Sequence, residues 1–241
     1  MAAIFITGTD TGVGKTALTG AIARVLREDG IDVGVSKPIA TGCRIEGEGW
    51  ISCDVEFLCQ AASCCDPLEI VCTYAFEDPV APRVAAERAG REIFLPDIIS
   101  NYFVLLGAHD LVLMEGIGGL LVPLNRSQTL VDLIRLIHTP VLIVSRNQLG
   151  TLNHTLLTID CLKRKKIPII GVILNHANTD EDASQTTNAE SITESTGVPV
   201  LGILPYSPDV DVEKGQMGGL PGLIREHVDL SGITKLARVL R

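Results

Sequence analysis

Six short apolar runs, rich in β-branched residues, alternate along the chain with longer amphipathic stretches. The predicted strands are Ala3–Thr7, Asp32–Ser36, Leu111–Met114, Val141–Val144, Ile169–Leu174 and Val200–Ile203. Almost every residue in them is apolar, which is typical of strands that are covered on both faces. The alternation predicts a doubly wound α/β fold, with a mostly parallel sheet and right-handed βαβ connections.

The amphipathic stretches between these runs predict the flanking helices. They are Lys15–Glu28, Cys53–Cys64, Pro96–Leu106, Leu130–Ile137, Leu152–Lys165 and Thr186–Thr196, with a terminal helix near Ile233–Leu240. Two regions break the pattern: Cys64–Arg91, which contains three prolines, is predicted as loop plus a short helix, and Tyr206–Gly222 as a surface loop. Because no repeat or low-complexity linker interrupts the 241 residues, we expect a single domain over residues 1–241.

Composition narrows the possible partners. Hydrophobic residues make up 46% of the chain and charged residues 20%, as in a globular protein, and the net charge of -9 argues against non-specific binding to nucleic acid. The N-terminus lacks the basic region of a signal peptide, and no apolar run approaches the roughly 20 residues of a membrane span. We therefore expect a cytoplasmic protein without a membrane or nucleic-acid partner, in which a local basic site could still hold anionic phosphates.

Seven cysteines are present, six of them within thirty residues: Cys43, Cys53, Cys59, Cys64, Cys65 and Cys72, with Cys161 apart. A metal or iron–sulfur centre is one interpretation of this cluster. The number is odd, however, and no Cys-x-x-Cys pair or other standard ligand spacing occurs, so free thiols in a reducing compartment are the preferred interpretation.

The segment Gly8–Thr16, Gly-Thr-Asp-Thr-Gly-Val-Gly-Lys-Thr, lies between the first predicted strand and the first predicted helix. Small residues allow backbone N–H groups to surround an anion, and the dipole of the following helix favours negative charge. Lys15 would reach the β- and γ-phosphates of a nucleotide, and the Thr16 hydroxyl would bind Mg²⁺. With this loop between a strand and a helix, the predicted α/β fold is of the P-loop NTPase type. Five residues rather than the usual four separate Gly8 from Gly14, so an ordinary glycine-rich turn is the alternative.

An acidic side chain follows the third predicted strand. Glu115 ends an apolar run and precedes Gly-Ile-Gly-Gly, which places a carboxylate at the edge of the sheet where ligands bind. Mg²⁺ prefers one or two carboxylates together with phosphate oxygens. Thr16, Glu115 and one more acid would therefore suffice. We favour Asp54 over Asp10, although an acid just after Ser52 is also what a helix N-terminus prefers.

Lys37 lies at the end of the second predicted strand, in Ser-Lys-Pro-Ile-Ala-Thr-Gly. A lysine at this edge would add positive charge beside the phosphate loop. A solvent-exposed lysine at a strand end is the alternative. The proline and the Thr-Gly pair after it indicate a shaped loop.

Taken together, these segments resemble the dethiobiotin synthetase family. The resemblance covers most of the chain in order: Gly8–Thr16, Lys37–Gly42, Ser52–Asp54, Tyr74–Pro82, Glu115–Gly119, Leu149–His154, Gly171–Asn175 and Gly202–Pro205. The additional residue in the phosphate loop is itself a family feature. One departure is Gly12, where members often carry Glu or another side chain, so any role of that side chain is absent here.

The resemblance implies an ATP- and Mg²⁺-dependent cyclo-ligase of biotin biosynthesis. One amine of 7,8-diaminononanoate takes up CO₂ to give a carbamate, and ATP converts the carbamate to a carbamic–phosphoric anhydride. The second amine then closes the cyclic urea of dethiobiotin and releases phosphate. Positioning and electrostatic stabilisation would supply most of the catalysis.

The resemblance also implies roles for individual residues. Lys15, Lys37 and Thr11 form the catalytic set; Thr16, Asp54 and Glu115 hold Mg²⁺; and Thr11, Lys37 and Thr41 contact the diamine or its carbamate. The nucleotide contacts are Gly12, Val13, Gly14, Lys15, Thr16, Ala17, Asp54, Glu115, Gly116, Ile117, Gly118, Asn175, His176, Leu204, Pro205 and Tyr206. A homodimer is implied, with the substrate site at the interface and with Gly150 and Asn153 of the partner subunit reaching into it.

Three other functions fit parts of the pattern. A Par/Min-type ATPase would use the same fold as a dimerising switch, but such proteins usually carry a further lysine early in the loop, where this chain has Thr-Asp-Thr. A cobyrinate amidase-type synthetase needs a glutaminase domain, for which 241 residues leave no room. A non-enzymatic nucleotide-binding module does not need the paired lysines and acids.

Overall fold

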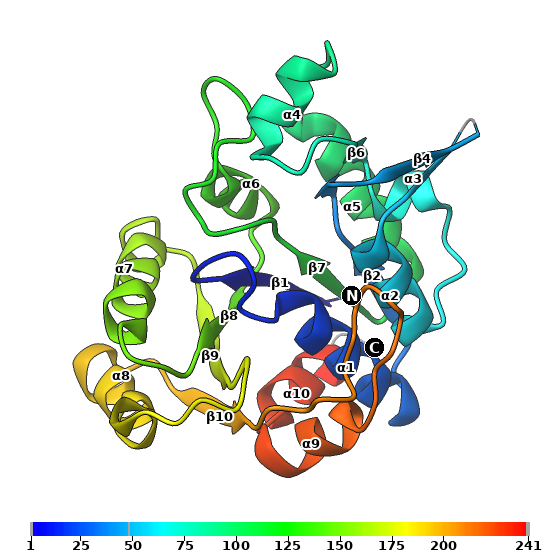
Figure 1. The fold of residues 1–241 in the computed structure, drawn as a ribbon. Helices are drawn as coiled ribbons and strands as arrows, with labels where there is room; N and C mark the ends of the chain where they lie inside the picture. Colours follow the sequence, from blue (N-terminus) through cyan, green and yellow to red (C-terminus); the bar gives the residue numbers. More distant parts are fainter. Residues whose placement is uncertain (1, 48, 240–241) are drawn as a thin grey trace.

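A computed structural model describes residues 2–47 and 49–239, and a six-stranded parallel sheet forms its centre (Figure 1). The strand order is β10-β9-β8-β1-β7-β2. The strands are β1 (Ala2–Gly8), β2 (Val33–Ser36), β7 (Leu111–Glu115), β8 (Val141–Arg146), β9 (Ile169–Asn175) and β10 (Val200–Leu204). The predicted α/β fold class is confirmed, and each predicted strand is found within two residues of its expected ends.

Helices cover both faces of the sheet because its side chains point alternately to either side. On one face, Ile4 and Ile6 pack with the apolar stripes of α1 (Lys15–Glu28), α9 (Leu220–His227) and α10 (Ser231–Val239), and with the buried end of α2 (Cys53–Ala62). On the other face, Phe5 joins the core formed with α5 (Leu95–Ala108), α6 (Leu130–Ile137), α7 (Thr151–Arg164) and α8 (Asn188–Thr196). The sheet is thereby buried between two hydrophobic layers.

The C-terminal part differs from the prediction in two places. The surface loop expected as far as Gly222 ends earlier, because α9 begins at Leu220 and buries Leu220 and Ile224. Pro221 is tolerated there because the backbone N–H groups of a helix's first turn have no acceptor within the helix, so the missing N–H of proline breaks no hydrogen bond. A short 3₁₀ helix, Ala183–Thr186, precedes α8, so that helix begins two residues later than expected. The last residue of the expected terminal helix, Leu240, lies outside the described residues.

The irregular region after Cys64 contains more order than one short helix. It forms α3 (Leu68–Val71), β6 (Tyr74–Phe76) and α4 (Pro82–Arg88). Strand β6 pairs in parallel with β3 (Ile39–Thr41), and β4 (Arg44–Glu46) pairs with β5 (Gly49–Ile51) as a separate hairpin. The β3–β6 pair fixes the segment after Lys37 beside the carboxyl end of the main sheet.

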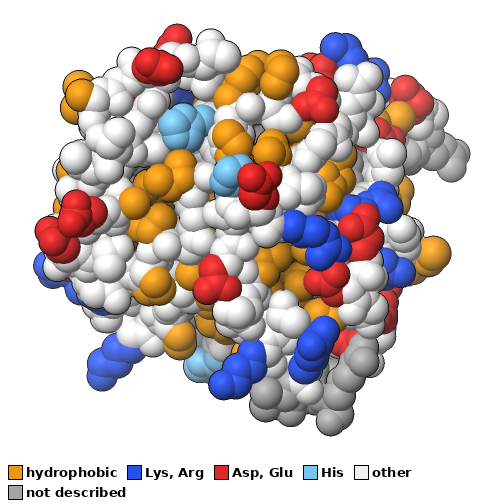
Figure 2. Space-filling view, turned by 90° about the horizontal axis from the view of Figure 1, so that it is seen from below, with side chains coloured by type: hydrophobic (Ala, Val, Ile, Leu, Met, Phe, Trp, Pro, Cys, Tyr) orange, Lys and Arg blue, Asp and Glu red, His pale blue; other side chains and the backbone are white. Residues whose placement is uncertain are grey.

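Charged side chains of both signs are interspersed on the face shown in Figure 2, with small hydrophobic groups between them. Among residues 2–47 and 49–239, no helix is long and apolar enough to cross a membrane.

Candidate functional site

A cavity of about 740 Å³ lies at the carboxyl edge of the sheet, beside the loop that follows β1. Parallel strands all end at this edge, so residues distant in the sequence meet there. The predicted site residues that line it are Thr11, Gly12, Gly14, Lys15, Thr16, Ala17, Lys37, Thr41, Asp54, Glu115, Gly116, Ile117 and Gly118. Most of the predicted phosphate, metal and substrate residues thus surround one space.

The phosphate loop owes its shape to two glycines in the left-handed region. Gly12 has φ +70° and Gly14 has φ +94°. At Gly14 a Cβ atom would lie only 2.3 Å from Nδ2 of Asn175, so the position excludes any side chain. Helix α1 begins directly afterwards at Lys15, and the unpaired N–H groups of its first turn provide an anion site.

Lys15 bends back over the loop, where its Nζ donates a hydrogen bond to the Asp10 carbonyl at 2.8 Å. Burial lowers the pKa of Lys15, and the Glu115 carboxylate acts in the opposite direction. A partly desolvated ammonium group interacts strongly with any anion that enters, because little water screens it.

Lys37 and Glu115 form a buried ion pair at the ends of β2 and β7. Lys37 Nζ donates to Glu115 Oε1 at 2.7 Å and also to Asp54 Oδ2. The side chain of Lys37 is 6% exposed and that of Glu115 is 0% exposed, so the alternative of a solvent-exposed lysine is wrong. Burial alone lowers the pKa of Lys37, but the Glu115 and Asp54 carboxylates outweigh it and the pKa is raised. Lys37 is therefore held in its charged form.

Thr16 belongs to the same cluster, since its hydroxyl donates to Glu115 Oε1 at 2.8 Å. The second carboxylate oxygen of Glu115, Oε2, is buried and has no hydrogen-bond partner among the described residues. Lys15 also interacts with both carboxylates, so the two lysines and the two acids form one charged cluster. A hydroxyl, two carboxylates and an unpartnered oxygen form a donor set that suits a hard cation.

Asp54 rather than Asp10 lies beside Glu115. Asp54 is in the first turn of α2, which Ser52 caps through a hydrogen bond from the Val55 amide. Asp10 accepts the Thr11 amide at 2.7 Å and lines a separate small cavity on the outer side of the loop.

A second cavity, of about 190 Å³, shares Gly12, Gly14 and Ala17 with the first. The other predicted residues that line it are Asn175, His176, Leu204, Pro205 and Tyr206. Asn175 Nδ2 donates to the Val13 carbonyl at 3.0 Å, which leaves the amide oxygen and the second N–H available to a ligand. Val13 itself lines neither cavity, and only its backbone takes part. The two adjoining spaces match a phosphate region and a base region.

Gly150 and Asn153 lie apart from this space within one chain. Gly150 precedes α7 and lines the small outer cavity, and Asn153 is exposed one turn later.

All seven cysteines are free thiols, and the described residues contain no group of three His, Cys, Asp or Glu side chains arranged to hold a metal ion.

Comparison with known proteins identifies the family. A family model described as an AAA domain matches residues 2–214. The ATP-dependent dethiobiotin synthetase BioD of Anaeromyxobacter dehalogenans strain 2CP-C is 41% identical over 210 residues, which cover 87% of this chain and 92% of that protein. The protein of the same name from Nitrosopumilus maritimus is 36% identical over 236 residues, covering 98% of this chain and 100% of the relative. The chain belongs to the dethiobiotin synthetase family.

Solved structures show how widely the synthetase fold is shared. The MinD cell division protein of Aquifex aeolicus superimposes with a TM-score of 0.57 at 17% identity, covering 100% of this chain and 97% of that protein. MinD complexed with Mg-ADP from Pyrococcus horikoshii gives 0.57 at 18% identity, covering 99% and 95%. At these identities the likeness shows a P-loop NTPase fold alone, which the Par/Min-type alternative also predicted.

Several residues that were not predicted as site residues also line the main cavity of this synthetase-family chain, among them Pro79, Val80, Ala81, Pro82 and Val122. Val212 and Glu213 line the main cavity from the segment predicted as a surface loop. Nothing in the local pattern distinguishes Glu213 from its acidic neighbours; Asp209, for example, accepts the Gly219 amide and closes the segment. Arg146, at the end of β8, also contacts the phosphate loop, and its position at a strand end was the available signal.

Proposed function

We propose that the chain is an ATP-dependent dethiobiotin synthetase, which closes a cyclic urea on 7,8-diaminononanoate with CO₂ and ATP. Membership of the family supports the reaction. The observation in the structure that carries the proposal is the buried Lys37–Glu115 pair beside the phosphate loop. A nucleotide-binding module has no need of a buried lysine at this point, whereas transfer of a phosphoryl group to a carbamate requires positive charge there.

The oxygen atoms around Glu115 suit a magnesium ion, and the proposed function includes this ion. Mg²⁺ takes oxygen ligands and keeps several waters, so Thr16, Asp54 and Glu115 would hold it together with phosphate oxygens. The buried and unpartnered Oε2 of Glu115 supports this assignment. When bound, the ion would neutralise charge on the phosphates.

Lys15 and Lys37 have separate roles in this account. Lys15 crosses the loop and would stabilise the γ-phosphate, while Lys37, 2.7 Å from Glu115, would face the carbamate. A carbamate oxygen forms the new bond to the γ-phosphorus as the bond to ADP breaks. The second amine, which must be neutral to attack, then forms the second C–N bond at the carbonyl carbon and releases phosphate. Thr11 and Thr41 line the same cavity and would hold the diamine or its carbamate.

Nucleotide recognition would use the adjoining cavity. The Asn175 oxygen would accept a hydrogen bond from the amino group of adenine, and the N–H that does not bond Val13 would donate to a ring nitrogen. His176 and the segment from Leu204 to Tyr206 would form the walls around the base, and Glu213 would lie near the ribose.

A homodimer would complete the substrate site. Leu149 is 80% exposed and Leu157 is 62% exposed, and both lie on or beside α7. Exposed leucines on one element favour burial against a partner. Gly150 and Asn153, which do not line the main cavity of their own chain, would then serve the site of the partner subunit.

Phosphate release measured with and without the diamine tests the proposal. Purified protein with Mg²⁺, bicarbonate and ATP is expected to release phosphate only when 7,8-diaminononanoate is added, and mass spectrometry is expected to detect dethiobiotin. Equal turnover of ATP without the diamine, and no ureido product, would favour the nucleotide-switch alternative.

A further inference from the structure

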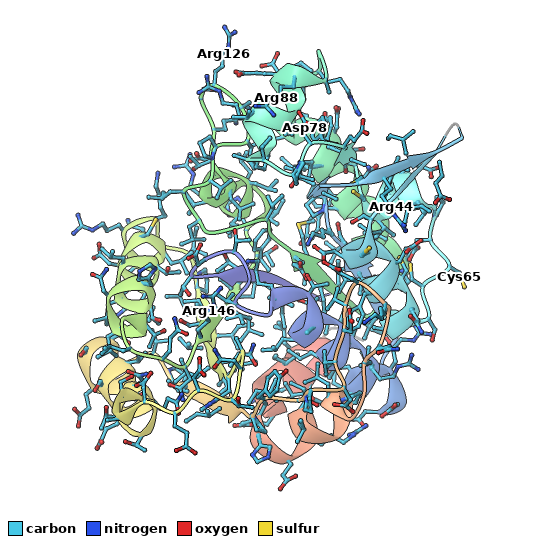
Figure 3. The ribbon with its side chains drawn as sticks, in the orientation of Figure 1. Arg44, Cys65, Asp78, Arg88, Arg126 and Arg146 are labelled. Carbon is cyan, nitrogen blue, oxygen red and sulfur yellow. The ribbon has the colours of Figure 1, made fainter. Side chains whose placement is uncertain are left out.

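Arg146 lies against the outer side of the phosphate loop (Figure 3). It is the last residue of β8, the strand next to β1, and its Nη2 donates a hydrogen bond to the Thr11 carbonyl at 3.2 Å. The same nitrogen lies 3.0 Å from where a Cβ atom on Gly12 would be. The guanidinium group therefore fills the space that a side chain at position 12 would otherwise occupy.

The guanidinium group of Arg146 is only partly satisfied by hydrogen bonds within the protein. Among the described residues it makes no ion pair, and its Nε–H is buried without a hydrogen-bond partner. Leaving a donor of a charged group buried and unpartnered costs free energy. Asp10 lines the same small cavity, so the fold supplies negative charge beside Arg146 but no acceptor for its Nε–H.

The topology places Arg146 opposite the lysine and acid cluster. In the strand order, β8 is on one side of β1, while β7 and β2, which carry Glu115 and Lys37, are on the other. Arg146 lines the small cavity of about 90 Å³ with Val13 and His154, and does not line the main cavity. It therefore acts through the loop rather than by touching the phosphates.

A phosphate loop binds an anion with N–H groups that point inward, which requires the carbonyl groups between them to point outward. The Arg146 guanidinium captures one such carbonyl, that of Thr11. The preceding residue of β8 supports the same loop, because Ser145 Oγ hydrogen-bonds the Thr9 hydroxyl at 3.1 Å and that of Thr151 at 2.6 Å. Hydrogen bonds from Arg146 and Ser145 at the end of β8 therefore hold the loop at two points.

We propose that Arg146 is a positioning residue of the nucleotide site, which holds the Thr11–Gly12 segment in its anion-binding conformation through the Thr11 carbonyl. The inference rests on the proposed function insofar as the ligand of the loop is ATP. It adds a third cation to Lys15 and Lys37, placed behind the loop.

Two substitutions and a control test this role. Arg146→Met removes the charge and the donors, Arg146→Lys keeps the charge and one donor group, and Arg164→Met removes an exposed arginine that pairs with Asp160 on α7. Calorimetric titration with ATP and Mg²⁺ gives the Kd, steady-state kinetics give KM for ATP and for the diamine, and thermal unfolding without nucleotide reports the fold.

Arg146→Met is expected to raise the Kd and KM for ATP about tenfold, as loss of a charge-assisted hydrogen bond does, with the Tm of the nucleotide-free protein unchanged. Arg146→Lys is expected to recover most of the ATP affinity, and Arg164→Met to bind as the wild type does. An unchanged Kd in Arg146→Met would overturn the proposal, as would an equal rise in both KM values together with a lower Tm. If ATP binding depends on Arg146 but no dethiobiotin forms, the proposed function fails while the positioning role stands.

Discussion

Glu115 and Lys37 meet as a buried pair, with 2.7 Å between Oε1 and Nζ, where β7 and β2 end beside the phosphate loop. Glu115 has no solvent exposure, and Lys37 has 6%. Each side chain therefore depends on the other for its charge, in addition to the role proposed for it in catalysis. Substitutions here are expected to change stability and activity together, and the two effects have to be separated by design.

Lys37→Met is expected to lower turnover by at least about 100-fold, because a positive charge that stabilises the phosphoryl transfer is lost. It is also expected to cost about 3–5 kcal/mol of unfolding free energy, since Glu115 remains buried without its partner. Steady-state turnover and urea unfolding measure the two effects.

The double variant Lys37→Met with Glu115→Gln is expected to recover most of the lost stability, because no unpaired buried charge remains and Asp54 is partly exposed, while turnover stays low. Lys163→Met, at an exposed lysine that bonds the Thr196 carbonyl, serves as the control. Near-normal turnover in Lys37→Met would contradict a catalytic role for this lysine.

Thr16→Val removes the hydroxyl that donates to Glu115 at 2.8 Å and that is proposed to bind Mg²⁺. We expect the Mg²⁺ concentration needed for half-maximal turnover to rise about tenfold, as loss of one ligand-sphere contact does. Thr16→Ser keeps the hydroxyl and is expected to retain the wild-type requirement. Identical Mg²⁺ titrations for the valine variant and the wild type would contradict the ligand set.

Gly14→Ala places a methyl group 2.3 Å from Asn175 Nδ2 and also forces a left-handed alanine. Gly30→Ala is the matched control, since Gly30 has φ +80° and a Cβ there would meet no atom within 4 Å. Both variants are expected to lose about 1–2 kcal/mol of stability to backbone strain. Only Gly14→Ala is expected to lose ATP binding, and equal calorimetric affinities for the two variants would refute the role of the close approach.

The sequence predicted those features that depend on local pattern. Strands such as β1 are apolar throughout because both faces are buried, and the glycines around Lys15 fall where a strand gives way to a helix. What it could not predict depends on long-range packing. The position of Asp54, rather than Asp10, near Glu115 depends on how α2 packs against the rest of the fold. Glu213 reaches the cavity only because its segment folds back over the loop. The two-stranded β3–β6 pair, three residues per strand, is too short to show a period.

Asp132 provides a pH-dependent stability test away from the proposed site. It accepts hydrogen bonds from the backbone amide and hydroxyl of Thr129 at the start of α6, both at 2.9 Å, and the amide bond above all holds its pKa below the usual range. A carboxylate whose pKa is depressed by folding stabilises the fold above its unfolded pKa of about 4, and this contribution is lost as the pH falls through the folded value.

Asp132→Ala is expected to cost about 1 kcal/mol at pH 7, as loss of a helix cap does, and progressively less as the pH falls below about 4. Urea unfolding at several pH values measures the difference. Asp160→Ala, at an exposed residue paired with Arg164, is expected to cost at most about 0.5 kcal/mol. A cost for Asp132→Ala that is independent of pH would contradict the role of the ionised carboxylate.

Isotope incorporation tests most directly whether this chain builds a cyclic urea from a diamine and CO₂ with the consumption of ATP. Purified protein is given ¹³C-bicarbonate, Mg²⁺, ATP and 7,8-diaminononanoate, and the product is analysed by mass spectrometry and ¹³C NMR. The expected product is dethiobiotin with the label in its ureido carbonyl, with one phosphate released per molecule of product. Hydrolysis of ATP at the same rate with and without the diamine, and no labelled ureido carbon, would contradict it.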